Sequence, residues 1–149
     1  MTFLASSLFA RKKTLLLSFE QSIEQNAIES GVAPLVAALN VPGQCKSIAS
    51  CEGHRGIFFF EEPPYVMFHA AEHLARRMAI AIEPEYGNCK LNFSWRVSAW
   101  FSPQNAELVW CIKLTSTDLA STWRRAKIDQ DLQHLAGVVS GVILGFNPT

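Results

Sequence analysis

The stretch between residues 90 and 101 constrains the fold more than any other part of the chain. It reads KLNFSWRVSAWF, and apolar side chains fall at every second position from Leu91 to Phe101. This period of two is typical of a β-strand with one buried face. A turn sequence, SPQNAE, comes next, and a second apolar stretch runs from Leu108 to Leu114. The two stretches predict a long antiparallel hairpin, with Arg96 and Trp100 on the side that a helix or a ligand would cover.

Three regions have helical periodicity. The first runs from Phe19 to Asn40, where Pro34 fits the first turn of a second helix. The next is Ala70–Ile82, and the last is Asp118–Leu144, which Asp118 can cap. The last region carries one apolar stripe at steps of three and four, formed by Ile128, Leu132, Leu135, Val139, Val142 and Phe146.

The order of these elements predicts the fold class. Shorter strands are expected at Lys46–Ser50, Ile57–Glu61 and Tyr65–Phe68, between Gly and Pro residues that interrupt the chain. We expect a single α+β domain over residues 1–149, with an antiparallel or mixed sheet that includes the hairpin and is covered by helices.

Composition narrows the classes of function. The chain has 149 residues, a hydrophobic fraction of 49%, a charged fraction of 17% and a formal net charge of zero. A general nucleic-acid coat would have an excess of Lys and Arg. No stretch approaches the roughly 18 apolar residues of a membrane span, and the basic residues 11–13 follow the N-terminal apolar stretch instead of preceding it. These features predict a cytoplasmic protein that does not bind membranes.

The best candidate site is SCEGH, which includes Ser50, Cys51, Glu52, Gly53 and His54. It follows a predicted strand, and sites are common where rigid elements meet loops. Cys51 could act as a thiolate nucleophile, with His54 as its base or charge partner. The other interpretations are a ligand-binding loop and a purely structural turn.

The neighbouring strands suggest which further residues belong to this site. We expect Ser50, Glu52 and Gly53 to bind a ligand together with Tyr65, His69 and Arg96, and we expect Cys51 to be partly exposed there. Two other cysteines, Cys89 and Cys111, lie in stretches with strand character and are predicted to be buried.

Other patterns are less specific. HAAEH, residues 69–73, has the letters of an inverted zinc-protease motif, but His69 is predicted to end a strand and so does not share a helical face with the second histidine. No metal site is expected. Basic clusters at 76–77 and 124–127 are either solvated helix faces or, with Arg96, a phosphate site. Gly137, Gly141 and Gly145 lie one helical turn apart, which leaves a homodimer open.

Several segments together resemble a known family. The segments are LVAALNVPG, SIASCEGH and PPYVMFHAAEHLARRM. In order and spacing they are similar to the wybutosine-synthesising methyltransferases, which act on the hypermodified guanosine of phenylalanine tRNA, over roughly the first half of the chain. The resemblance implies a small α+β domain, S-adenosylmethionine as methyl donor without a Rossmann fold, and a site around Ser50 and Cys51. This chain has Glu52 and His54 where the family has Ser and Arg.

Two hypotheses of function follow. The first is a methyltransferase-like protein that binds S-adenosylmethionine or a nucleoside-like ligand at SCEGH. The neutral net charge of the chain and the acidic pair Glu61-Glu62 disfavour tRNA as the partner. The second is a non-catalytic binding or assembly module in which SCEGH is a structural corner.

Overall fold

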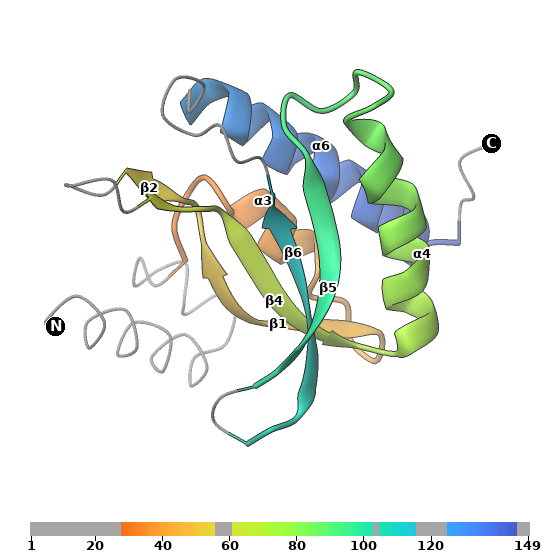
Figure 1. The fold of residues 1–149 in the computed structure, drawn as a ribbon. Helices are drawn as coiled ribbons and strands as arrows, with labels where there is room; N and C mark the ends of the chain where they lie inside the picture. The colour runs from red at the N-terminus through yellow and green to blue at the C-terminus, as the bar shows by residue number, and fades with distance from the viewer. Residues whose placement is uncertain (1–27, 56–60, 103–104, 116–124, 146–149) are drawn as a thin grey trace, which may run out of the picture.

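The computed structural model describes residues 28–55, 61–102, 105–115 and 125–145. They form an α+β fold in which helices cover one face of a sheet (Figure 1), as the sequence predicted. In chain order the elements are α3 (Ala33–Ala38), β1 (Cys45–Cys51), β2 (His54–Arg55), β3 (Glu61–Glu62), β4 (Tyr65–Ala70), α4 (Glu72–Ile82), the 3-10 helix η1 (Glu83–Glu85), β5 (Trp95–Phe101), β6 (Leu108–Leu114) and α6 (Arg125–Ile143).

Within the described ranges, the main sheet has four strands in the order β1-β4-β6-β5, and each neighbouring pair is antiparallel. The strands β2 and β3 form a separate two-stranded ladder. In β1 the register shifts between Ser47 and Ala49, which marks a β-bulge. Beyond the bulge, Cys51 lies opposite Tyr65 of β4.

The predicted hairpin is present as β5 and β6, which pair along their whole length without a register shift. Its first strand begins at Trp95, later than the predicted Leu91. Leu91 and Phe93 are nevertheless buried, as the alternation predicts. The pattern therefore identified the buried positions from Leu91 to Trp95, but the start of the strand was wrong, and Ala99 and Phe101 at its far end are exposed.

A buried carboxylate explains this late start. Asp131 of α6 is 1% exposed. Its oxygens accept hydrogen bonds from the main-chain N–H groups of Asn92 (2.8 Å) and Phe93 (3.0 Å) and from the indole Nε1 of Trp95 (2.9 Å). In the register of the hairpin, the N–H of Asn92 is the one of these two that would face β6, and because it donates to α6 it does not join the ladder. The segment before β5 is thus fixed to the last helix.

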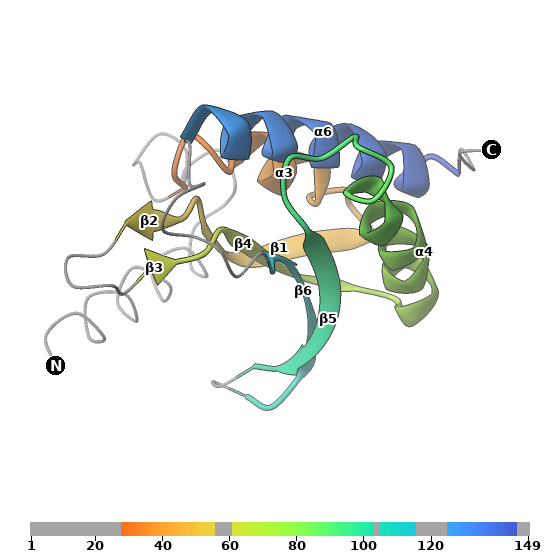
Figure 2. The same cartoon turned by 45° about the horizontal axis from the view of Figure 1, so that its top comes forward.

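The helices α3, α4 and α6 lie on one side of the sheet (Figure 2), and the main core lies between the two layers. We call this side the helical face and the other side the outer face. The stripe predicted on α6 is buried from Ile128 to Val142, whereas Phe146 and the proposed cap Asp118 lie outside the described residues. The largest buried side chains are those of Trp95, Phe68, Leu35, Leu39, Met78, Ile82, Ile112 and Leu114.

The remaining elements agree with the sequence except at their ends. Pro34 stands in the first turn of α3, as expected, and residues 19–27 of that helical region lie outside the described residues. α4 begins at Glu72 because Ala70 still belongs to β4. Of the strand predicted at 57–61, only Glu61 is described, and it begins β3.

Cys89 was predicted to be buried in a strand, and this is wrong. It is exposed in the turn after η1, with a φ of 60°. Its N–H donates to the carbonyl of Tyr86 (3.1 Å), and the next residue, Lys90, donates from its N–H to the carbonyl of Glu85 (2.9 Å). The chain turns back towards α6 here, so this stretch is not part of the sheet. Cys111 is buried in β6, as predicted.

Candidate functional site

SCEGH lies where β1 ends and the chain crosses to β2. Gly53 has a φ of 89°, a left-handed conformation that favours glycine. Its N–H points back to the Sγ of Cys51, at 3.4 Å. The loop between the two strands is therefore a tight turn.

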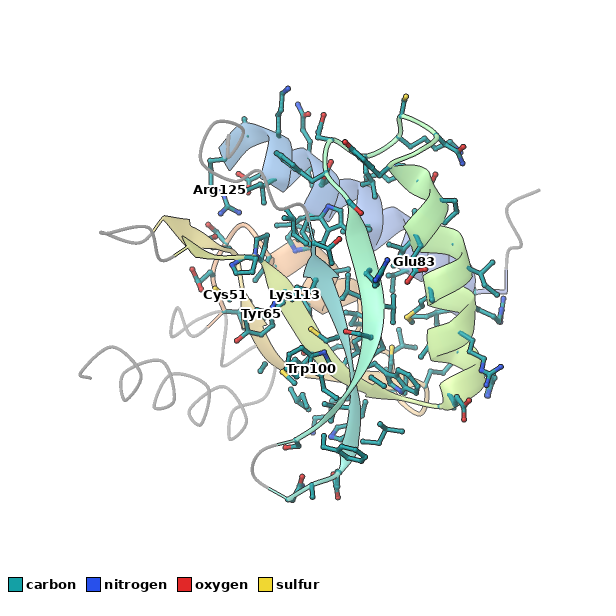
Figure 3. All side chains as sticks on the ribbon, viewed as in Figure 1. Cys51, Tyr65, Glu83, Trp100, Lys113 and Arg125 are labelled. Carbon is teal, nitrogen blue, oxygen red and sulfur yellow. The ribbon has the colours of Figure 1, made fainter. Side chains whose placement is uncertain are left out.

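The thiol of Cys51 is buried, and the prediction that it would be partly exposed is wrong. Cys51 is 5% exposed and packs on the outer face with Ala49, Tyr65, Met67 and Cys111. A nucleophile must be reachable by its substrate, so this position favours a packing role. Figure 3 shows Cys51 and Tyr65 on neighbouring strands.

Ser50 and Cys51 do not share a site. Ser50 lies opposite Val66, whose side chain belongs to the core under the helices. Because successive side chains of a strand point to opposite faces, Ser50 and Cys51 lie on opposite sides of the sheet. The main chain of His54 pairs with Glu62 in the β2–β3 ladder. The side chain of His54 lies outside the described part of the structure, so its approach to Cys51 stays a prediction.

Glu52 holds the loop against the rest of the fold. Its Oε2 accepts a hydrogen bond from the N–H of Gly31, at 2.7 Å. The guanidinium of Arg125 donates from Nη1 to the carbonyl oxygens of Glu52 (2.6 Å) and Gly53 (3.3 Å). The same guanidinium donates from Nη2 to Asp129, at 2.6 Å. We call Gly31, Glu52, Arg125 and Asp129 the corner cluster.

The polar groups of the corner cluster bind one another and the loop. The guanidinium of Arg125, which donates to a carboxylate and two carbonyls, keeps little capacity for a ligand. Arg125 was identified in the sequence only as part of a basic cluster, and Gly31 was not singled out as a site residue. Because Arg125 contacts the loop across a separation of 73 residues, no local pattern could have predicted the cluster.

The other predicted ligand residues are spread across the sheet. Cys51, Tyr65, Lys113 and Arg96 form one row across the four strands of the outer face. His69 lies at the far end of β4, where its Nε2 is 3.8 Å from an oxygen of Glu107. The structure thus places Tyr65 next to Cys51, Arg96 two strands beyond Tyr65, and His69 away from both.

A second cluster lies at the β5–β6 end of this row. The Nζ of Lys113 is 5.7 Å from the centroid of the Trp100 ring, a cation–π distance. The indole Nε1 of Trp100 donates to the Oγ of Ser98, at 2.8 Å. We call Arg96, Ser98, Trp100 and Lys113 the β5–β6 patch. Lys113 was missed in the sequence, although the hairpin register places it opposite Arg96.

The two cations of the patch stand directly opposite each other on paired strands. Like charges in this position destabilise a sheet. Among the described residues, each cation has a compensating neighbour: Lys113 has the Trp100 ring, and Arg96 has Glu83, with 3.9 Å between Nε and Oε1. Figure 3 shows Glu83 beside β5 and Trp100 further along the hairpin. The patch therefore offers positive charge next to an aromatic ring that is 46% exposed.

Comparison with known proteins adds no family to this description. No protein-family model, no curated protein and no solved structure matches the chain. Within the described ranges, no group of three or more His, Cys, Asp or Glu side chains could hold a metal ion. Among the same residues, no helix has the length and apolar character needed to cross a membrane.

Proposed function

We propose that this chain is a non-catalytic binding module in which SCEGH is a structural corner and the β5–β6 patch holds the ligand. Two features of the loop support the first part. The Cys51 thiol is packed against four neighbours, and the polar groups of Glu52 and Gly53 are engaged by Gly31 and Arg125. A catalytic loop needs groups that are free to meet a substrate.

The single observation that carries the second part is the pairing of Arg96 with Lys113 beside Trp100. Two cations held opposite each other gain from an anion placed between or above them. Arg offers a forked set of donors and Lys a point charge, and both suit phosphate oxygens. Among the described outward-facing side chains of the four strands, none is acidic.

The aromatic ring suggests what the anion is attached to. An exposed indole on a sheet offers a stacking surface for a nucleobase. A nucleoside phosphate combines a base and an anion in one small molecule, as the patch combines an indole with two cations. Because the chain as a whole is neutral, the patch fits a small ligand better than a long nucleic acid, whose many phosphates need many cations.

Calorimetric titration of the whole chain with adenosine 5′-monophosphate tests this proposal, with adenosine as the comparison ligand. We expect the monophosphate to bind more tightly than adenosine. We expect Lys113→Gln and Arg96→Gln each to weaken it by about tenfold, the effect of losing one charged contact. Lys90→Gln is the matched control, because Lys90 pairs with Glu85 away from the patch. Equal affinity for the two ligands, or no effect of either substitution, contradicts the proposal.

The methyltransferase-like interpretation predicts a different result when the chain is titrated with S-adenosylmethionine in the same calorimeter. It expects S-adenosylmethionine to bind at SCEGH and Cys51→Ala to weaken that binding, while Lys113→Gln leaves it unchanged. This result would place the ligand-binding site at SCEGH instead of at the β5–β6 patch. Binding of adenosine 5′-monophosphate at the patch, with no heat from S-adenosylmethionine, supports the binding module.

A further inference from the structure

The edge of β5 that faces away from β6 pairs with no other strand in the described part of the chain. β5 is the last strand of the sheet, and its ladder with β6 can be followed at both ends. The N–H of Ser102 donates to Glu107 (2.8 Å), and the carbonyl of Ser94 accepts from Thr115 (2.8 Å). Since main-chain groups of a strand alternate in direction, the even-numbered residues face β6. The main-chain groups of Val97, Ala99 and Phe101 therefore point outward.

The edge of β5 lacks the usual protection against pairing. Proteins guard an edge with a proline, a bulge or several charges. β5 has neither a proline nor a shift in its register, and Arg96 is its one charged side chain. The opposite edge strand, β1, carries a bulge. At the Trp95 end, Arg96 is paired with Glu83 of η1, so the accessible stretch runs from Val97 to Phe101.

Exposed apolar side chains surround this accessible stretch. Phe101 is 74% exposed, and Leu108, directly opposite it on β6, is 50% exposed. The end of the hairpin extends away from α3, α4 and α6 (Figure 1), so none of these three helices covers it. A contiguous apolar surface beside a free strand edge is typical of an interaction site.

We propose that the occupant of this edge is a second copy of the chain, with the two β5 strands antiparallel about a two-fold axis at Ala99. Each outward-facing residue then meets another: Val97 meets Phe101 of the partner subunit, and Ala99 meets Ala99 of the partner subunit. Both sheets join into one continuous sheet.

The self-complementarity of β5 is the reason for choosing a second copy over a foreign strand. In this register apolar side chains meet apolar side chains along the helical face. On the outer face, Ser98 meets Trp100 of the partner subunit, and Arg96 meets Ser102 of the partner subunit. No like charges come together, and the two-fold axis makes the contact close on itself. The glycines of α6 offer no comparable surface, because nothing defines a partner for them.

Charge substitution at Ala99 tests this register. Ala99 is exposed, so Ala99→Lys and Ala99→Glu are compatible with the folded chain. Each variant alone places two like charges face to face at the axis, whereas a mixture of the two places opposite charges there. Sedimentation equilibrium of the whole chain measures the outcome, with Ile80→Lys as a matched control because Ile80 is exposed on α4.

We expect the wild type and Ile80→Lys to dimerise with equal affinity, and each Ala99 variant alone to dimerise at least about tenfold more weakly. We expect the equimolar mixture to recover the dimer. A wild-type chain that is monomeric at about 100 μM, a concentration at which even a weak specific dimer is populated, overturns the proposal. A dimer that neither Ala99 variant weakens, or that the mixture fails to recover, overturns it as well.

Discussion

Arg125 at the start of α6 donates a hydrogen bond from Nη1 to the main-chain oxygen of Glu52, with 2.6 Å between the two atoms. This contact joins the last helix to the turn after β1. It fixes the turn that carries SCEGH against the first turn of α6. The Arg125 side chain is 41% exposed, so solvent weakens its ion pair with Asp129 but not the geometry of its bonds to the loop.

Replacing Arg125 with alanine should therefore destabilise the fold. We expect a loss of about 1–2 kcal/mol in the free energy of unfolding, because the loop carbonyls lose charged donors. Arg76→Ala is the control, since Arg76 forms only an exposed ion pair with Glu72 on α4, and that loss should stay below about 0.5 kcal/mol. Urea unfolding measures both. Equal losses in the two variants would show that the corner cluster adds nothing to stability.

A methyl group at Gly31 should have the opposite effect from one at Gly137. An added Cβ at Gly31 would lie 2.5 Å from Nη2 of Arg125 and 2.6 Å from Oε2 of Glu52, so these side chains must move. We expect Gly31→Ala to lower the free energy of unfolding by about 1–2 kcal/mol.

Gly137 provides the matched comparison for this substitution. It is exposed within α6, and nothing lies within 4 Å of an added Cβ. Gly137→Ala should raise the free energy of unfolding by about 0.5–1 kcal/mol, because alanine favours the helix. Thermal unfolding followed by circular dichroism measures the change in stability of Gly31→Ala and of Gly137→Ala. A stabilising Gly31→Ala would mean that the corner cluster is loosely packed.

The part of the fold that follows from local pattern was predictable. The hairpin follows from a period of two over residues 91–101, and the buried stripe of α6 follows from its own spacing. Both signals lie within one element and need no knowledge of the remaining chain. The start of β5 was misjudged because Asp131, far along the chain, accepts a hydrogen bond from the N–H of Asn92, which a continued strand would direct toward β6.

The position of Cys51 was not predictable, because it depends on a bulge. Before the bulge, Ser47 lies opposite Phe68, whose side chain is in the main core. Strict alternation would place Ala49 and Cys51 on that same helical face. The extra residue at the bulge shifts both to the outer face, where they meet Met67 and Tyr65. Nothing in SIASC marks where the extra residue stands.

The four cysteines should differ in their rates of alkylation. Cys89 is exposed, whereas Cys45, Cys51 and Cys111 are buried. Burial also raises the pKa of the Cys45 thiol, and a hydrogen bond between that thiol and the main chain of Val41 offsets part of the increase. Less of the Cys45 thiolate is therefore present at a given pH. We expect iodoacetamide to label Cys89 at least about tenfold faster than the other three, as quantified by peptide mass spectrometry.

Unfolding the chain in denaturant is the control for this experiment, since all four cysteines should then react at similar rates. A native Cys51 that reacts as fast as Cys89 would contradict its burial. That result would restore the interpretation of SCEGH as a loop with an accessible nucleophile.

Asp131 should be the most sensitive polar position in the described part of the chain. Its buried carboxylate accepts bonds from the main chain of Asn92 and Phe93 and from the indole of Trp95. Asp131→Ala leaves these donors without an acceptor, and each buried unsatisfied group costs about 1–3 kcal/mol. We therefore expect a loss of at least about 3 kcal/mol in the free energy of unfolding.

Two further variants separate the role of the acceptor from that of the helix. Asp131→Asn keeps the shape of the side chain but turns one acceptor into a donor that faces other donors. Its free energy of unfolding should therefore lie between those of Asp131→Ala and the wild type. Gln133→Ala changes an exposed residue of the same helix and should shift the free energy by less than about 0.5 kcal/mol. The fluorescence of Trp95 should respond to the Asp131 variants, because its Nε1 loses its partner. If Asp131→Ala unfolds like Gln133→Ala, the carboxylate does not hold the segment before β5, and the late start of that strand needs another cause.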